Sequence, residues 1–264
     1  MNVNNFFAID VGNTNIVVAL IKNFKINKIK KFKTKDFKKK KIFLFIKFNE
    51  IKKILSVQKK IKCIISSVVP EINYNIRKTC FSFLKDKPHF VLFNKTKLNI
   101  KINVKNKKQV GADRIVNSVA VKSLYKTPAI VIDFGTATTF DVINISGNYI
   151  GGLITPGINL SLYNLFKKTS MLPLIKFKRK NSLIGKDTKN AIENGIYWSY
   201  IGLVTFIIKK IQNKFKKNFF CISTGGLSKI ISKDINLINI VNENLTIHGL
   251  IEIFKLNYYE KSNS

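Results

Sequence analysis

Histidine and cysteine are scarce in this 264-residue sequence, and each scarcity excludes a kind of chemistry. The two histidines, His89 and His248, stand alone, and the three cysteines, Cys63, Cys80 and Cys221, are far apart and form no CxxC pair. A zinc site or a Ser-His-Asp triad would therefore lack its parts. An odd number of widely spaced cysteines indicates reduced thiols in a protein core.

Long apolar runs are missing as well. The stretch Asn194–Ile208 comes nearest, but it lies between Glu193 and Lys209 and falls short of the roughly 18 apolar residues that a membrane span needs. Near the start of the chain, Phe6–Ile9 runs directly into an Asp, so no basic-then-apolar leader is present. We therefore expect a cytoplasmic protein without a membrane segment.

Acidic residues and arginine are both in short supply. The chain has 47 basic and 14 acidic residues, a net charge of +33, and its arginines are Arg77, Arg114 and Arg179. A surface selected for phosphate normally uses arginine, whose planar guanidinium binds in a bidentate way. Lys, Asn, Ile and Phe are all abundant together, as AT-rich codon usage would produce. Basic runs such as Lys28–Lys41 are then solvated, although a true polyanion surface remains an alternative. We expect no specific nucleic-acid partner, only weak and salt-sensitive attraction.

One pattern occurs twice in the chain. A short apolar strand runs into Asp10–Asn15, and 123 residues later another runs into Asp133–Thr138. Each loop is followed by a returning strand, a turn and a third strand. The strands predicted for the two copies are Phe6–Ile9, Ile16–Ile21 and Phe24–Ile29, then Ala129–Ile132, Phe140–Ile145 and Tyr149–Ile154. Such a repeat indicates an internal duplication, and we predict two α/β domains with mixed sheets, 1–112 and 113–264.

Hydrophobic periodicity completes the expected order of elements. Lys30–Lys41 is interpreted as a polar connection between elements. Further strands are expected at Cys63–Val69, His89–Leu92 and Phe219–Ser223, and helices at Phe43–Val57, Pro70–Leu84, Ala112–Lys126, Gly157–Lys168 and Thr188–Phe215.

The repeated Asp-x-Gly loops are suited to holding phosphate. Glycine allows backbone N–H groups to approach an anion, and an Asp at the strand tip can hold a cation beside it. The alternative is an ordinary hairpin turn, which also favours Asp, Gly and Asn. Because both copies follow an apolar strand, the pattern favours phosphate binding at Asp10 and Asp133.

Two further glycine turns are candidates. Thr224-Gly225-Gly226 could let a nucleoside lie against the backbone, or could simply join a strand to a helix. Gly111-Ala112-Asp113-Arg114 opens a predicted helix. There Asp113 is either a base beside an anion-binding Arg114 or only a favourable partner of the helix dipole.

These motifs, taken with several others, resemble the type III pantothenate kinases along nearly the whole chain. The matching segments are Asp10–Asn15, Ser66–Pro70, Gly111–Arg114, Asp133–Thr138, Gly152–Gly157, Ile184–Thr188, Ser223–Leu227 and Leu245–Leu250. The resemblance implies the acetate-and-sugar-kinase, actin and heat-shock-chaperone superfamily, with a duplicated ribonuclease-H-like fold and a nucleotide cleft between the domains. It implies phosphorylation of pantothenate by ATP, the first step of coenzyme A synthesis. A kinase for another small hydroxyl substrate and a catalytically altered regulatory relative remain alternatives.

Site residues follow from the same resemblance. It implies Asp113 as the catalytic proton acceptor and Asp133 as a ligand of a monovalent cation, potassium or ammonium, with magnesium accompanying ATP. It implies that ATP meets Asp10, Val11, Gly12, Asn13, Thr14, Asn15, Ile16, Val17 and Thr136, and that pantothenate meets Gly111, Ala112, Asp113, Arg114 and Thr188. Where the family commonly has Tyr, Asn-Pro and Asn, this sequence has Val104, Asn106-Lys107 and Asp187. The resemblance also implies a homodimer, for which the small and aromatic residues of Ala191–Phe206 suit close helix packing: Gly195, Tyr197, Trp198 and Gly202.

Overall fold

The computed structural model describes residues 5–37 and 48–259. Its strands are β1 (Asn5–Val11), β2 (Asn15–Lys22), β3 (Lys25–Lys33), β4 (Lys62–Ser67), β5 (His89–Phe90), β6 (Ala129–Phe134), β7 (Ala137–Ile143), β8 (Tyr149–Pro156), β9 (Phe220–Thr224) and β10 (Ile240–Val241). Its α-helices are α1 (Thr34–Phe37), α2 (Phe48–Gln58), α3 (Pro70–Leu84), α4 (Ala112–Leu124), α5 (Ile158–Lys168), α6 (Thr188–Phe215), α7 (Ser228–Ile231) and α8 (Leu245–Phe254). Residues 43–47 of the helix expected at Phe43–Val57 lie outside the described residues.

The two sheets have the same topology. Their strand orders are β3-β2-β1-β4-β5 and β8-β7-β6-β9-β10. In each sheet the first strand pairs antiparallel with the second and parallel with the fourth. The predicted duplication is therefore present in three dimensions, and Asp10 of β1 and Asp133 of β6 hold equivalent places in it. This is the duplicated ribonuclease-H-like arrangement that the family resemblance implies.

The compact units have other bounds than the predicted division at residue 112. One unit is Met1–Tyr125 with Leu245–Ser264, and the other is Lys126–Asn244. The reason is that α4 and α8 pack on each other and on β4 of the first sheet. Gly249 makes this approach possible, because a Cβ there would overlap the carbonyl oxygen of Val116.

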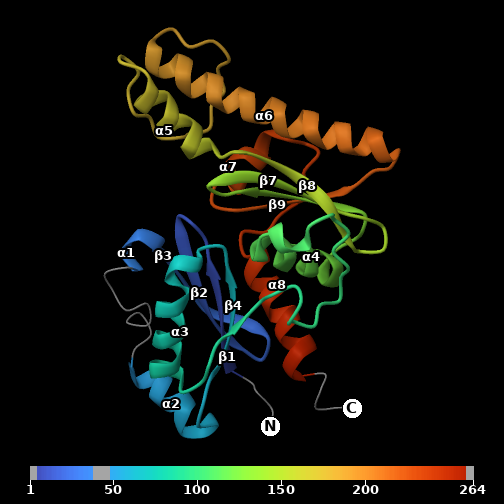
Figure 1. Ribbon diagram of the computed structural model, residues 1–264. Helices are drawn as coiled ribbons and strands as arrows, with labels where there is room; N and C mark the ends of the chain where they lie inside the picture. The colour runs from blue at the N-terminus through green and yellow to red at the C-terminus, as the bar shows by residue number, and fades with distance from the viewer. Residues whose placement is uncertain (1–4, 38–47, 260–264) are drawn as a thin grey trace. The chain divides into compact units, whose positions relative to one another are not determined.

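Helices cover both faces of the first sheet. Phe7 and Ile9 of β1 pack with Ile72 of α3 in one core, while Phe6 points to the opposite face. There the ring of Phe6 stacks on Phe254 of α8 at 3.7 Å between centroids. Figure 1 shows α3 on one side of this sheet and α8 on the other. The loop after β1 is thus carried by a strand that is rigidly packed on both sides.

In the second unit, α6 supplies most of the helical cover of the sheet. Tyr197 and Val204 are fully buried and pack in one core with Ile130 and Ile132 of β6. Among the described residues, α6 alone is long and apolar enough to cross a membrane by length and composition. The inner face of α6 packs against the sheet, and 33% of its most apolar stretch is buried.

The structure corrects the prediction that Lys30–Lys41 is a connection. Residues up to Lys33 continue β3, since Lys30 pairs with Val18 and Phe32 with Ile16 of β2. The lysines of this strand are exposed, and an edge strand rich in lysine is protected from pairing with other chains. Residues 38–41 lie outside the described part of the chain. The three cysteines are buried free thiols, as predicted.

Candidate active site

The loop after β1 is closed by its own backbone and by Thr34. The N–H of Gly12 donates to the carbonyl of Asn15 at 2.9 Å. Thr34 donates its hydroxyl to the carbonyl of Gly12 at 2.6 Å and its N–H to the carbonyl of Thr14 at 2.9 Å. These bonds hold Asn13 and Thr14 at the surface in a defined turn.

The residues expected to meet ATP here differ in what they can offer. The side chains of Val11 and Ile16 are fully buried in the first core, so only their backbone groups could contact a phosphate. Asn13 and Thr14 are exposed and can donate from their side chains.

Asp10 lies in an unusual electrostatic environment. It pairs with Ser66 across β1 and β4, and it is partly buried. Burial, and then the nearby carboxylate of Asp113, raise the pKa of Asp10 to about 7, while Ser66 and Lys31 partly oppose this rise. The structure thus brings Asp10 and Asp113, which are distant in sequence, close enough to interact. Two carboxylates that repel each other in this way favour a proton or a cation between them.

Asp113 is held at the start of α4 with a defined orientation. Its Oδ1 accepts a hydrogen bond from the N–H of Arg114 at 2.8 Å. Burial raises the pKa of Asp113, and the N–H and guanidinium of Arg114 work against this rise. Ala112 and Arg114 are partly buried beside it.

Gly111 has a steric reason to be glycine. It is the N-cap of α4, with φ −56° and ψ 144°, a conformation open to any residue. A Cβ at this position would overlap Oδ1 of Asp113 and come within 3.4 Å of Cγ1 of Val68. The glycine therefore makes room for the carboxylate of Asp113.

The loop after β6 in the second unit is also packed against glycines. The N–H of Gly135 donates to the carbonyl of Ala137 at 3.1 Å. Gly225, at φ +87°, comes so close that a Cβ there would lie 2.5 Å from Oδ1 of Asp133 and 2.7 Å from the carbonyl oxygen of Phe134. Similarly, a Cβ on Gly157 would overlap the carbonyl of Thr136. The ends of β6, β8 and β9 therefore meet at one edge, and Gly225 belongs to the Asp133 site.

Thr136 and Thr188 are both exposed side chains of the second unit. Thr188 is the first residue of α6, and Asp187 caps that helix by accepting from the N–H of Asn190 at 2.8 Å. Gly111–Arg114 belong to the first unit, so their predicted proximity to Thr188 stays a prediction. In the first unit, Asn106 caps a 3₁₀ turn by accepting from the N–H of Lys108 at 3.1 Å, and Val104 is partly buried.

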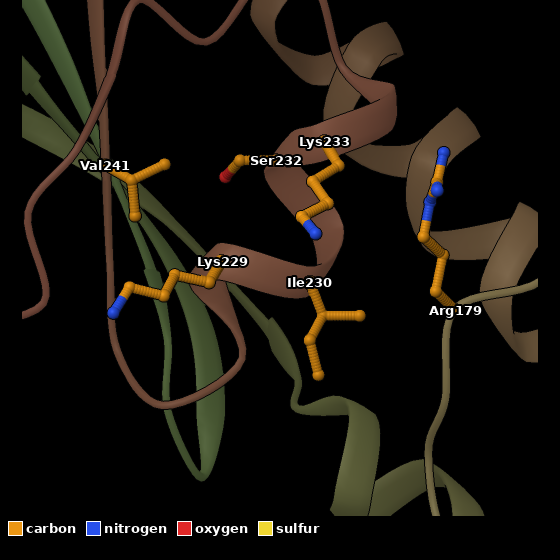
Figure 2. A pocket seen from close by; sticks show the side chains of 6 residues that line it. All are labelled: Arg179, Lys229, Ile230, Ser232, Lys233 and Val241. Atoms are coloured by element: carbon orange, nitrogen blue, oxygen red, sulfur yellow. The ribbon is translucent and has the colours of Figure 1, made fainter.

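A pocket of about 450 Å³ lies beside α7, the short helix that comes after Gly225 in the sequence (Figure 2). Figure 2 shows Lys229 and Lys233 on the helical turns at α7, with Arg179 coming from a separate segment. The remaining lining residues are Ile230, Ser232 and Val241. Two of the basic side chains that line this pocket are paired with carboxylates, Arg179 with Asp234 and Lys229 with Glu243.

Sequence reasoning missed three residues of the first unit's site. Thr34 and Lys31 fell within the stretch interpreted as a connection, yet Thr34 braces the loop after β1 and Lys31 stabilises charged Asp10. Ser66 stood out only as part of a motif, although strand pairing sets it beside Asp10. No local signal marks these partners, because each depends on pairing between distant strands.

A duplicated sheet of this order, with an Asp-x-Gly loop after the first strand of each copy, places the chain in the actin-like fold class. Solved structures of similar fold include a putative Baf family transcriptional activator from Campylobacter jejuni, 18% identical, with a TM-score of 0.59 over 98% of this chain and 100% of that one. Another is a putative 2-dehydro-3-deoxygalactonokinase from Sinorhizobium meliloti, 9% identical, with a TM-score of 0.57 over 96% and 97% of the two chains. At these identities the likeness shows the fold alone.

Sequence relatives narrow the class to one family. The family model for type III pantothenate kinase matches residues 6–210. The type III pantothenate kinase of Bacillus cytotoxicus is 37% identical over 261 residues, which are 95% of this chain and 96% of the relative. That of Paramagnetospirillum magneticum is 41% identical over 194 residues, 74% and 75% of the two chains. The chain belongs to the type III pantothenate kinase family.

Proposed function

We propose that this kinase transfers the γ-phosphoryl group of ATP to pantothenate, giving 4′-phosphopantothenate and ADP in the first step of coenzyme A synthesis. The proposed reaction follows from membership of the type III pantothenate kinase family. The observation that carries the chemistry is the pair Asp10 and Asp113, whose carboxylates interact within one unit although 103 positions separate them. The protein is proposed to act in the cytoplasm.

Asp113 is the proposed proton acceptor for the pantothenate hydroxyl. Its raised pKa makes it a stronger base than a free carboxylate, and the N–H of Arg114 keeps one oxygen engaged so that the other can face the substrate. Arg114 is proposed to orient pantothenate through charge-assisted hydrogen bonds.

The first unit's loop is proposed to hold the phosphates. Its exposed Asn13 and Thr14 and the backbone around Gly12 supply donors, in a turn that Thr34 keeps in place. Magnesium fits Asp10, because this cation typically uses one or two carboxylates together with substrate phosphates. The described residues contain no larger group of His, Cys, Asp or Glu that could hold a metal. When bound, magnesium would neutralise phosphate charge during transfer.

A monovalent cation fits Asp133. Its carboxylate oxygen and the carbonyl oxygen of Phe134 both flank the space that a side chain on Gly225 would fill. Carboxylate and carbonyl oxygens are the hard donors that such a cation takes, so potassium or ammonium is proposed to bind at Asp133. Thr136, exposed beside them, is proposed to contact the phosphates of ATP, and Thr188 to contact pantothenate.

The kinase is proposed to work as a homodimer through the outer face of the second unit. Phe206 of α6 is 60% exposed and Ile154 of β8 is 64% exposed. Phe206, together with Leu153 and Phe215, borders an apolar groove of about 540 Å³. Tyr197, expected from the sequence to serve helix packing, is fully buried in its own core and is not available for this contact.

The purified chain should be given radiolabelled ATP and pantothenate, with and without potassium or ammonium. Formation of 4′-phosphopantothenate is expected, with a panel of sugars in place of pantothenate giving little product. Binding of ATP without transfer to pantothenate would contradict the proposed reaction and favour the regulatory alternative. Faster transfer to a sugar would favour a kinase for another hydroxyl substrate.

A further inference from the structure

The segment 179–187 has no helix or strand of its own, yet it is fastened at several points in the second unit. At its start, Arg179 donates two hydrogen bonds to Asp234, at 2.8 and 2.6 Å. The hydroxyl of Tyr197 donates to the same carboxylate, and these partners lower the pKa of Asp234 to about 2. Figure 2 shows Arg179 beside the pocket at Lys233.

The next residue reaches into α6. Lys180 forms an ion pair with Glu193, whose side chain is only 5% exposed. A carboxylate so far removed from water needs a charged partner, and Lys180 supplies one. The same ammonium group also donates to Oδ1 of Asn190 at 3.1 Å.

Asn190 links Lys180 to Asp187, the residue that precedes Thr188. Its Nδ2 donates to Oδ2 of Asp187 at 2.6 Å, and its backbone N–H donates to Oδ1 at 2.8 Å. Lysine can only donate and an ionised carboxylate can only accept. The amide of Asn190 can therefore satisfy both neighbours in one orientation only, with its oxygen toward Lys180.

The rest of the segment is packed against the same helix. A Cβ on Gly185 would lie 2.5 Å from Cα of Ala191, so only glycine allows the chain to pass this close to α6. Beyond it, the indole N–H of Trp198 donates to the carbonyl of Ser182 at 3.0 Å. The segment is thus folded back along the first three turns of α6.

From these contacts we infer that Lys180, Asn190 and Glu193 are positioning residues for pantothenate, which hold Thr188 and the 179–187 segment in the geometry that binds this substrate. The inference rests on the proposed function and extends it to residues outside the proposed substrate contacts. Glu193 sets the position of Lys180, Lys180 sets the orientation of the Asn190 amide, and the amide holds Asp187 at the start of α6.

The test compares steady-state kinetics of four variants. Asn190→Ala breaks the relay but keeps the ion pair, and we expect KM for pantothenate to rise about tenfold while KM for ATP stays within twofold. Lys180→Met/Glu193→Leu removes both charges, so no buried charge is left alone and Tm should stay near wild type. Its KM for pantothenate should rise like that of Asn190→Ala. Lys180→Arg keeps the positive charge and the hydrogen-bond donors, so its kinetics should stay close to those of the wild type. Lys178→Met, an exposed neighbour, is the matched control.

Hydrogen exchange of residues 182–190 provides a readout independent of turnover. Faster exchange in Asn190→Ala than in Lys178→Met is expected. Unchanged exchange together with an unchanged KM for pantothenate would overturn the inference, as would a parallel rise of KM for ATP. If the wild-type chain does not phosphorylate pantothenate at all, the proposed function is refuted. The claim that these residues position pantothenate is then refuted as well. Altered exchange in the variants would then still show that the relay holds the segment.

Discussion

Replacing Gly111 by alanine should damage catalysis without damaging the fold. The backbone at this position, φ −56° and ψ 144°, is as open to alanine as to glycine, and alanine restricts the unfolded chain more. The added methyl group, however, would occupy the space of Oδ1 of Asp113. The carboxylate would have to turn away, because the other neighbour, Cγ1 of Val68 at 3.4 Å, leaves the methyl group little room to move.

The size of the effect follows from what the carboxylate loses. Turning it breaks the 2.8 Å hydrogen bond from the N–H of Arg114. A hydrogen bond to a charged group is worth about 1.5–3 kcal/mol. Displacement of a catalytic group by about 1 Å can cost on the order of 10²-fold in rate. We therefore expect kcat to fall roughly 10²-fold, with Tm within a few degrees of wild type.

A double-mutant cycle identifies the cause. If the alanine acts only through the Asp113 carboxylate, it should cost nothing further in an Asp113→Ala background, where nothing remains to collide with. Initial rates of 4′-phosphopantothenate formation and thermal melts of the four proteins would be measured side by side. A Gly111→Ala enzyme within threefold of wild type, or a full additional loss in the Asp113→Ala background, would refute this reasoning.

Four other predictions concern the two carboxylate sites and the assembly. Asp113→Asn should lower kcat by about 10²-fold or more with ATP affinity nearly unchanged by calorimetry, and turnover within a few-fold of wild type would exclude Asp113 as the base. Because the folded-state pKa of Asp10 is raised to about 7, its ionisation opposes folding as pH rises from about 4 to above 7. Ligand-free Asp10→Asn should therefore melt several degrees above wild type at pH 8 and at the same temperature near pH 4, and a constant difference across this range would contradict the shift. Sodium in place of potassium or ammonium should slow the reaction, whereas equal rates would count against a cation at Asp133. Light scattering at micromolar concentration should show a dimer, and Phe206→Glu should yield a folded monomer; a wild-type monomer with full activity would rule out the proposed assembly.

Much of the fold could be predicted because its signals are local. Pro70 begins α3 as an N1 proline, and Asp187 before Thr188 caps α6, so both helices have the expected bounds. The two Asp-x-Gly loops follow apolar strands and could be paired as a duplication from their residue types and order alone. Residues 30–33 were misassigned, because an edge strand with lysines on its exposed positions has no hydrophobic alternation to reveal it.

The site was harder to predict wherever it depends on packing between distant segments. The steric reason for Gly111 lies in the rotamer of Asp113, and the place of Gly225 beside Asp133 depends on the pairing of β6 with β9. The side of α6 that faces inward could not be read from a helix with apolar residues around its circumference. That ambiguity is why the sequence suggests Tyr197 for helix packing in a dimer, although its side chain is buried in the core of its own unit.

The stacking of Phe6 on Phe254 has a consequence for how the chain is made. The two rings are among the first and the last described residues to leave a ribosome, and the second unit is encoded between them. Part of one apolar face of the first sheet therefore stays uncovered until Lys126–Asn244 and then α8 have been made, while Lys126–Asn244 is contiguous and can fold as soon as it emerges. Completion of the first unit, which carries Asp10 and Asp113, thus has to follow synthesis of the second unit, and a chain cut short before α8 would be exposed to aggregation through that face.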